Sequence, residues 1–348
     1  MLGEPRLVSR PSLDETDIKI IGILQEEPRT TYLQLSRDCK VSIDSVRRRY
    51  ERLRKEGIVV REILALIPKA MGFDSLSWLG IVTDPGKENQ VLESLQAKRE
   101  ILLSFVEIGK YNIRSLLGIE HINDLANYVD SLKKTPYIND VDVMIWSDIE
   151  RMAYPKNLMI EPFHGTLDEV PRIEPDFSEP RTSSTSLANE PIQKDNLPLS
   201  KMCPSMDKTD EAILNILIHN ARIPFSNIAK QLGISTKTVI CRYRKLRKKW
   251  VWYSTLAINL RKIGYAGYVS YNIKVSSKTW VSDVFDRLIK IPNIIVALKM
   301  IGPYNINALA PFSSAQQLMK THASISAIPG VERIDEQIGD SMHVWPTR

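Results

Sequence analysis

The sequence is poor in the residues that build disulfide bridges and metal sites. Its 348 residues include only three cysteines, Cys39, Cys203 and Cys241, and five histidines that show no metal-binding spacing. Three widely separated cysteines cannot form a four-cysteine zinc site, and so few thiols are typical of a reducing compartment. The sequence therefore predicts no metal and no cofactor, and we expect a cytoplasmic protein.

Long apolar segments and phosphate-binding loops are also missing. No apolar run approaches the ~18–20 residues needed to span a bilayer, so we expect no membrane contact. No glycine-rich phosphate loop and no Gly-x-Ser-x-Gly turn occurs. The chain does carry an excess of positive charge, with 47 lysines and arginines against 41 acidic residues. Alone, this excess is a weak indication of a polyanionic partner, so its placement along the chain matters more.

The same unit occurs twice along the chain. When the sequence is shifted by 193 positions, with no gap introduced, residues 14–147 fall on residues 207–340. Asp14 then meets Asp207, and far downstream Tyr111-Asn112 meets Tyr304-Asn305. Because matches recur at one offset over the whole unit, we expect a tandem duplication of one fold.

The front of each unit is predicted to be a helix-turn-helix. Asp14 is a favourable N-cap for a first helix, because its carboxylate can accept an amide hydrogen bond there. A short second helix over residues 32–38 ends at a turn, and Ser42 then caps a third helix. The third helix carries an apolar stripe that we expect to face the core. Its members are Val46, Tyr50 and Leu53, matched by Val239, Tyr243 and Leu246.

The face opposite that stripe is strongly basic in both units, and no acidic residue occurs from Ser235 to Lys249. Polar side chains at the start of such a helix can reach base edges in a major groove, and the cations behind them can meet phosphates. A merely solvated charged face is the alternative, but the helix-turn-helix context, present twice, favours double-stranded DNA as a partner. The predicted contact residues are Ser42, Asp44, Ser45, Arg47, Arg48 and Arg52 in the first unit, and Ser235, Thr236, Lys237, Thr238, Cys241, Arg244, Lys245 and Lys248 in the second.

The back of each unit alternates strands and helices. After a strand over residues 58–67, the order β-α-β-β-α-β predicts a ferredoxin-like domain. In the first unit the expected strands are residues 75–83, 102–108, 112–119 and 141–145, and the expected helices are residues 87–100 and 122–134. The second unit repeats this order up to residue 338.

A segment rich in proline, serine and threonine separates the units and is too poor in apolar residues to order itself. The sequence therefore predicts an α+β protein of two tandem units, each a (winged) helix-turn-helix followed by a ferredoxin-like effector or assembly domain. The predicted division is a first helix-turn-helix at 12–60, a first ferredoxin-like domain at 61–154, a linker at 155–205, a second helix-turn-helix at 206–253 and a second ferredoxin-like domain at 254–345.

Together these motifs resemble the Lrp/AsnC (feast/famine) family of transcription regulators. The resemblance rests on Leu13-Asp14-x-x-Asp17, on Arg29 and Arg222 ahead of the second helices, and on Ser42-x-x-x-Val46-x-x-Arg49 with its counterpart in the second unit. In that unit Trp250 stands where the first unit and the family have a glycine. The resemblance implies a sequence-specific DNA-binding regulator, not an enzyme, whose α/β domains pair sheet to sheet and can assemble into homo-oligomers.

The resemblance also implies a small-molecule effector near the turn that links the two central strands. The candidate residues are Gly109, Asn112, Gly302 and Asn305, and the glycines would let a ligand or a neighbouring backbone approach closely. The alternative is that each glycine only completes a turn. The family commonly has an aspartate where this chain has the two asparagines, so the domain could serve assembly alone.

An enzyme similar to the sirohaem decarboxylases, which also pair two such units, is the rival interpretation. Their turn resembles Arg-x-His-x-Tyr-Asn, and both Tyr-Asn pairs of this chain match its end. The arginine would fall at Glu107 and Met300, and the histidine at Gly109 and Gly302. Because neither side chain is present in either unit, we favour the regulator.

Two helix-turn-helix heads in one chain predict an intramolecular pseudo-dimer. Regulators of this kind place two recognition helices about one DNA turn apart. The two heads differ where a third helix would meet the bases, since Asp44 and Arg47 correspond to Lys237 and Ile240. We therefore expect two non-identical half-sites instead of a palindrome.

Overall fold

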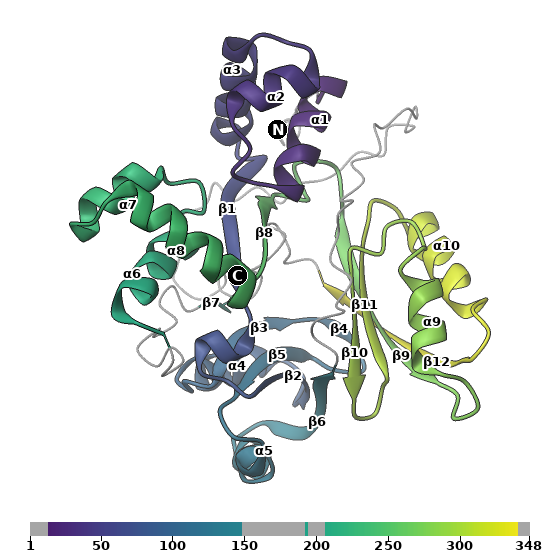
Figure 1. Cartoon of the computed structure of the whole chain (residues 1–348). Helices are drawn as coiled ribbons and strands as arrows, with labels where there is room; N and C mark the ends of the chain where they lie inside the picture. Colours follow the sequence, from purple (N-terminus) through teal and green to yellow (C-terminus); the bar gives the residue numbers. More distant parts are fainter. Residues whose placement is uncertain (1–12, 148–191, 194–205, 340–348) are drawn as a thin grey trace, which may run out of the picture.

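The computed structural model of the chain describes residues 13–147, 192–193 and 206–339. It contains two units, and in each unit three helices come first along the chain and an α/β domain follows (Figure 1). The fold is α+β, as the sequence predicts. Among the described residues, no helix is both long and apolar enough to cross a lipid bilayer.

Three short helices form the first helix-turn-helix: α1 (Glu15–Glu26), α2 (Tyr32–Cys39) and α3 (Ile43–Lys55). Asp14 caps α1 as predicted, because its carboxylate accepts a hydrogen bond of 2.9 Å from the backbone N–H of Asp17. The turn between α2 and α3 passes through Lys40, whose φ of +56° lies in the left-handed region. The predicted stripe on α3 is buried.

The second helix-turn-helix repeats this arrangement with α6 (Lys208–His219), α7 (Phe225–Leu232) and α8 (Thr236–Lys249). Asp207 caps α6, accepting from the backbone N–H of Asp210 at 2.8 Å. Gly233 takes the left-handed turn with φ +66°, a conformation that costs glycine no steric strain. The stripe on α8 is also buried.

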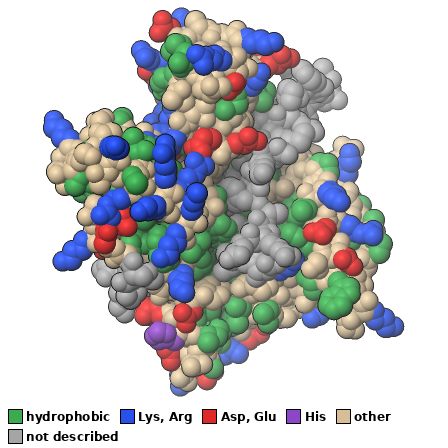
Figure 2. Space-filling model, viewed as in Figure 1, with side chains coloured by type: hydrophobic (Ala, Val, Ile, Leu, Met, Phe, Trp, Pro, Cys, Tyr) green, Lys and Arg blue, Asp and Glu red, His purple; other side chains and the backbone are tan. Residues whose placement is uncertain are grey.

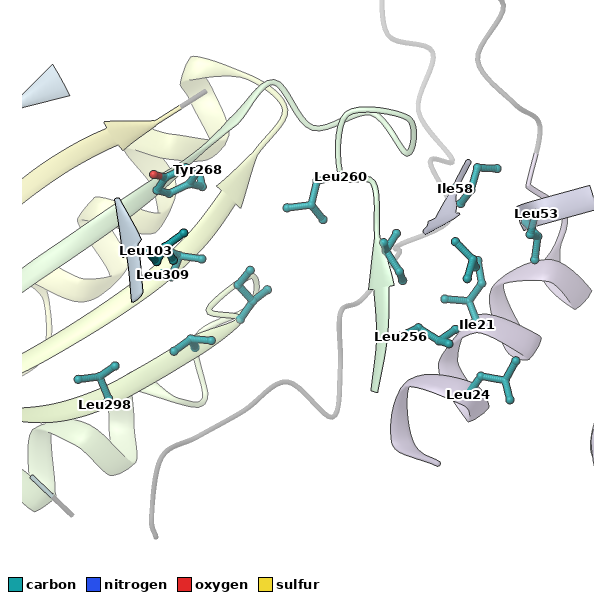
Figure 3. Packing of buried hydrophobic residues seen from close by; sticks show 14 of the residues in the cluster. Ile21, Leu24, Leu53, Ile58, Leu103, Leu256, Leu260, Tyr268, Leu298 and Leu309 are labelled. Atoms are coloured by element: carbon teal, nitrogen blue, oxygen red, sulfur yellow. The ribbon is translucent and has the colours of Figure 1, made fainter. Parts of the chain in front are cut away.

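The strands that follow the third helices pair with each other across the two units. They are β1 (Val59–Leu66) and β8 (Val251–Ile258), and they run antiparallel. Leu256 of β8 packs against Ile21 and Leu24 of the first head (Figure 3). The sequence predicts both strands but not their partner.

Each unit contributes a strand to the core of the other unit's helix-turn-helix. Leu64 and Leu66 of β1, which belong to the first unit, are buried in the core of the second head beside Ile213 and Leu217. Each helix-turn-helix is therefore seated on the strand of the other unit, and neither head can pack its full core without its neighbour.

Each α/β domain is a four-stranded sheet with two helices on one face. In the first unit the elements are a 3-10 turn η1 (Pro68–Met71), β2 (Ser75–Thr83), α4 (Glu88–Gln96), β3 (Ile101–Val106), β4 (Ile108–Gly109), β5 (Ile113–Ile119), η2 (Ile122–Asp124), α5 (Leu125–Lys133) and β6 (Ile138–Ser147). In the second they are β9 (Gly267–Val275), α9 (Val281–Leu288), β10 (Val296–Ile301), β11 (Ile306–Phe312), α10 (Ala315–Ser326) and β12 (Val331–Gly339).

The two sheets join into one of ten strands, in the order β4-β12-β9-β11-β10-β6-β2-β5-β3-β7. Strand β6 pairs with β10, where Ile145 lies opposite Ile301, and β4 pairs with β12, where Ile108 lies opposite Ile338. These two seams are equivalent under the repeat. Only Glu107 separates β3 from β4, so the sheet bends round until its ends meet. The inner faces enclose a shared core in which Leu103 lies beside Leu309 (Figure 3).

The ungapped alignment of the two units is wrong in one respect. Strands β1 and β8 begin at Val59 and Val251, and strands β2 and β9 begin at Ser75 and Gly267, so both pairs have an offset of 192, whereas the third helices and the Tyr-Asn turns keep 193. The backbone N–H of Ile58 closes the end of α3 on Leu53, with Gly57 left-handed at φ +67° before it. In the second unit Trp250 occupies the position that Ile58 has in the first. The second unit therefore has no residue equivalent to Gly57.

The predicted linker at 155–205 lies almost entirely outside the described residues. The exception is the short strand β7 (Ile192–Gln193), which pairs with β3 at the end of the sheet.

Candidate nucleic-acid interface

The tips of the two third helices are open to solvent. Ser42 caps α3 by accepting a 3.1 Å hydrogen bond from the backbone N–H of Ser45. Ser235 caps α8 in the same way, from Thr238 at 3.0 Å. Both capping residues are exposed, so the first turn of each helix is accessible from outside.

The predicted contact residues all lie on α3, on α8 or at their caps. The burial of the apolar stripes fixes which face of each helix points outward. The exposed ones are Ser42, Asp44, Arg47 and Arg48 on α3, and Ser235, Thr236, Lys237, Cys241, Arg244, Lys245 and Lys248 on α8. Ser45, Arg52 and Thr238 are half-buried.

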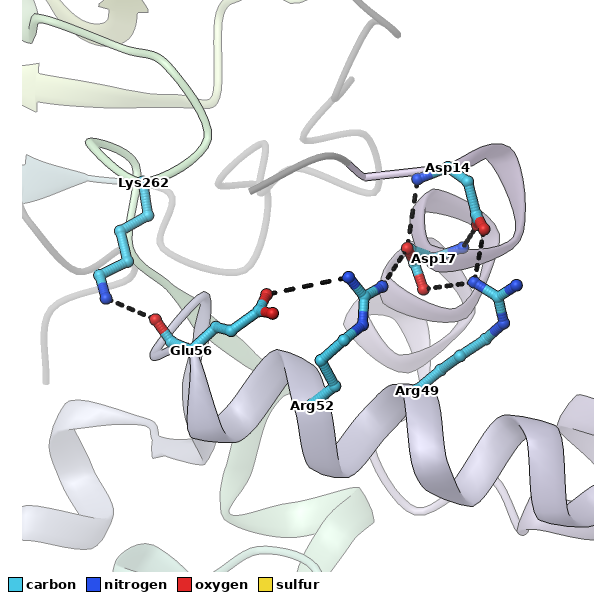
Figure 4. A network of polar contacts seen from close by, with 6 residues as sticks. All are labelled: Asp14, Asp17, Arg49, Arg52, Glu56 and Lys262. Carbon is cyan, nitrogen blue, oxygen red and sulfur yellow. Dashed lines mark hydrogen bonds and ion pairs between the residues drawn. The ribbon is translucent and has the colours of Figure 1, made fainter. Parts of the chain in front are cut away.

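Arg52 is engaged inside the protein. Its guanidinium forms an ion pair with the buried carboxylate of Asp17 at the start of α1, and it lies 3.9 Å from Glu56 (Figure 4). Arg49 reaches the same place, 2.9 Å from Asp17 and 2.6 Å from Asp14. These ion pairs tie α3 to the capped end of α1, so Arg52 is less available to a phosphate than its neighbours.

The second unit keeps one half of this network. Arg242 pairs with Asp207 and with Asp210 at 2.8 Å, as Arg49 does in the first unit. This hydrogen bond from Arg242, together with the backbone N–H of Asp210, lowers the pKa of Asp207. Lys245, which stands at the position of Arg52, is exposed and has no ion pair with any described residue.

Asp14, Asp17 and Arg49 each recur as the same residue type in the second unit, but the sequence alone does not show that their side chains bond to one another. The sequence does hold an indication of this contact, because the two carboxylates and the arginine all recur at the same offset of 193. A residue pair that repeats in both copies is a candidate contact, and here it fixes the third helix on the first.

The positive surface is more continuous on the second head. Figure 2 shows lysine and arginine side chains gathered over α8, with few acidic side chains among them. Among the described residues, Lys237, Arg244, Lys245 and Lys248 form no ion pair. Arg247, by contrast, pairs with Glu27 of the first head at 2.5 Å. Cations without acidic partners are the ones that can neutralise phosphates.

The candidate effector glycines lie at the two seams between the units. A Cβ on Gly109 would sit 2.4 Å from the backbone oxygen of Glu336 in β12, and one on Gly302 would sit 2.4 Å from the backbone oxygen of Val143 in β6. These distances are too short for any side chain. The glycines let a backbone of the other unit approach closely.

The candidate asparagines close the ends of strands within their own unit. The side-chain oxygen of Asn112 accepts from the backbone N–H of Thr83 at 3.0 Å, and that of Asn305 accepts from Val275 at 2.9 Å. Their amide oxygens are therefore occupied by backbone, as in a turn.

The core between the sheets contains a buried ion pair that the sequence does not reveal. Arg114 and Glu107 are 1% and 3% exposed, and Nε of Arg114 lies 3.1 Å from Oε2 of Glu107. The hydroxyl of Tyr268, from the other unit, donates to Glu107 at 3.0 Å. Burial raises the pKa of Glu107 even though Arg114 opposes it. The repeat places Met300 and Asn307 at these positions in the second unit, so the interior is not symmetric.

Comparison with known domain families identifies both heads. Residues 206–247 match the AsnC-type helix-turn-helix domain, and residues 13–60 match a winged helix-turn-helix DNA-binding domain.

Two relatives of this chain are similar to it over a stretch about as long as one unit. An uncharacterized HTH-type transcriptional regulator of Pyrococcus horikoshii is 29% identical over 144 residues, which are 41% of this chain and 90% of the relative. The HTH-type transcriptional regulator FL11 of the same organism is 25% identical over 136 residues, 39% of this chain and 90% of the relative.

Solved structures of one enzyme match nearly the whole chain. The siroheme decarboxylase NirDL covers 93% of this chain, and 91% of its own length is matched, with a TM-score of 0.58 and 13% sequence identity. At this identity the likeness concerns the fold alone, and it shows that the two-unit architecture also occurs elsewhere. One head thus matches the AsnC-type helix-turn-helix domain, the other matches a winged helix-turn-helix DNA-binding domain, and both are similar to the heads of HTH-type transcriptional regulators.

Proposed function

We propose that this chain is a sequence-specific DNA-binding transcription regulator that uses the exposed first turns of α3 and α8 as its two reading heads. The observation that carries the proposal is the combination, in both units, of a buried apolar stripe with an exposed, capped and cationic opposite face. Polar residues at such a tip suit base edges, and the cations behind them suit phosphates.

The two heads should not read the same sequence. Asp44 on the first tip corresponds to Lys237 on the second, so one head presents a carboxylate where the other presents an ammonium group. The second head also has more cations without acidic partners, and we infer that it supplies more of the sequence-independent affinity.

We infer that Gly109 and Gly302 serve assembly of the two units, and that Asn112 and Asn305 stabilise the turns of their own units. The glycines contact backbone across the seams, and the asparagine oxygens are bonded to backbone N–H groups. The proposal therefore places no effector at these four residues.

Titration of DNA binding against salt tests the proposal. We expect tight binding to a selected duplex, with an affinity that falls steeply as salt rises, because each neutralised phosphate releases counterions. Lys237→Glu, at the tip of α8, should weaken binding at least ~10-fold by adding a charge that phosphates repel. Lys278→Glu makes the same charge change on an exposed loop of the α/β domain and should leave affinity nearly unchanged. Equal effects of the two variants would contradict the proposal.

The fold likeness to NirDL favours an enzyme of the sirohaem-decarboxylase kind as a second candidate. The geometry of the two seams argues against this enzyme. A Cβ at Gly109 or Gly302 would lie 2.4 Å from a backbone oxygen of the other unit, so no histidine side chain fits there. Arg114, which follows the first turn on β5, is already in an ion pair with Glu107.

Adding an iron tetrapyrrole carboxylate to the purified chain separates the two candidates. The enzyme predicts a shifted absorbance band on binding and loss of carboxylate as carbon dioxide, with little DNA affinity. The regulator predicts neither change, together with salt-dependent DNA binding. Decarboxylation by this chain would overturn the regulator.

A further inference from the structure

The turn between the first two helices of each head carries an arginine that reaches into the other head. Arg29 donates from Nη2 to the backbone oxygen of Ile223 at 2.9 Å and from Nη1 to that of Ala221. Both oxygens belong to the equivalent turn of the second head. The guanidinium carbon of Arg29 also lies 3.9 Å from the centre of the Phe225 ring.

Arg222 makes the reciprocal contacts. It stands 193 positions after Arg29 and donates from Nη1 to the backbone oxygen of Pro28 at 2.7 Å. Its guanidinium carbon lies 5.3 Å from the ring centre of Tyr32 and 5.2 Å from that of Tyr50. We call the two arginines, with the carbonyls and rings that they touch, the arginine clasp.

The clasp reaches the recognition helices themselves. Tyr50 belongs to the buried stripe of α3, and Tyr243, which lies 5.6 Å from the guanidinium carbon of Arg29, belongs to that of α8. Each arginine therefore contacts the third helix of the opposite head. A rotation of one head would have to break carbonyl hydrogen bonds and ring contacts together.

Arginine is suited to this position for a physical reason. Its planar guanidinium can donate to two carbonyls from fixed directions while one face of the plane lies on an aromatic ring, whereas the ammonium of lysine is a point charge that does not fix this geometry. Both arginines are half-buried, and burial lowers the pKa of Arg29. A half-buried guanidinium loses hydrogen bonds if it leaves its carbonyl partners, so each arginine side chain keeps one position between the two heads.

We propose that Arg29 and Arg222 are positioning residues that hold α3 and α8 at one separation and thereby set the spacing between the two DNA half-sites. The proposal rests on the proposed function, because a spacing matters only if both heads meet DNA. The two seams of the sheet and the β1–β8 ribbon join the units away from the reading helices, whereas the clasp lies beside them, as does the ion pair of Arg247 with Glu27.

Distances between spin labels on the two helices test the clasp without DNA. Arg48 and Cys241 are exposed and stand at equivalent positions, so Arg48→Cys and the native Cys241 can carry the labels after Cys39→Ser and Cys203→Ser. We expect one narrow distance distribution for the intact clasp. The Arg29→Ala/Arg222→Ala variant should broaden it strongly, and Arg29→Lys/Arg222→Lys should broaden it less.

The control is Arg99→Ala, which removes an ion pair with Glu120 in the α/β domain and should leave the distribution unchanged. If the alanine variant does not fold, the lysine variant decides. A folded clasp variant with the distribution of the parent protein overturns the proposal.

Affinity for duplexes of altered spacing is the second readout. Two base pairs inserted between the half-sites should weaken binding by the parent protein ~10-fold or more, because both heads can no longer engage together. The clasp variants should lose less than about threefold on the same insertion, since their heads can adjust. Absence of DNA binding by the parent protein contradicts the proposed function, and the label distances would still decide the clasp.

Discussion

At the scale of single residues, the two third helices use one basic position differently, where the repeat aligns Arg52 with Lys245. Arg52 is bonded to Asp17, whose side chain is 1% exposed, while Lys245 is exposed without an ion pair among the described residues. The sequence predicts both as DNA contacts and cannot separate them, because a basic residue on an outward face looks the same with or without an acid nearby in space.

Alanine substitutions at these two positions should therefore act differently. Lys245→Ala should reduce the slope of log affinity against log salt by ~1, as expected for one lost phosphate contact. Arg52→Ala should change that slope less and instead destabilise the first head by about 1–3 kcal/mol, because the buried carboxylate of Asp17 loses one of its two arginine partners. Salt titrations and chemical unfolding of both variants measure this. A larger slope change for Arg52→Ala would contradict the assignment.

The glycine at each seam is a second residue with a specific requirement. Gly109→Ala should lower the free energy of unfolding by about 1–3 kcal/mol, because its Cβ would overlap a backbone oxygen that is held in the sheet. Gly22→Ala is the matched control, since nothing lies within 4 Å of its Cβ position. As a helix residue, Gly22→Ala should be neutral or stabilising by up to ~1 kcal/mol. If thermal unfolding shows the two variants to be alike, the close approach at the seam is wrong.

At the scale of elements, much of the fold could be predicted from local patterns. The caps at Asp14 and Ser42 mark helix starts, and the stripe of Val46, Tyr50 and Leu53 marks the buried face. These signals lie within one helix, so the sequence contains them in full. The pairing of β1 with β8 could not be predicted, because both strands are largely apolar and their alternation names no partner.

The capped start of the second head should make its stability depend on pH. The hydrogen bond from Arg242 lowers the pKa of Asp207 below its ordinary value of 3.8. A carboxyl with a lowered pKa in the folded state contributes stability above the unfolded value and loses it as the pH falls through the folded value. Asp207→Asn keeps the cap hydrogen bond but loses the charge.

We therefore expect Asp207→Asn to be slightly less stable than the parent protein at pH 7, with the difference shrinking as the pH falls below 3.8. Urea unfolding midpoints at pH 7 and at pH 3 measure this. A difference that stays constant with pH would mean that the charge of Asp207 does not stabilise the head.

At the scale of the whole molecule, the two units are joined by many contacts, among them two strand seams, the β1–β8 ribbon, the exchanged head cores and the arginine clasp. The sequence predicts an intramolecular pair, since two complete units lie in one chain. It does not predict that each head is seated on the other unit, because that depends on contacts between residues ~190 positions apart, which no local periodicity encodes.

Selection of bound duplexes from a random-sequence pool tests most directly whether the two fixed, unlike helix tips read DNA. We predict enrichment of two different half-sites at a single spacing of about one helical turn or a multiple of it. A symmetric consensus would contradict the unequal heads, and a pool that remains random after repeated rounds would contradict the proposed function itself.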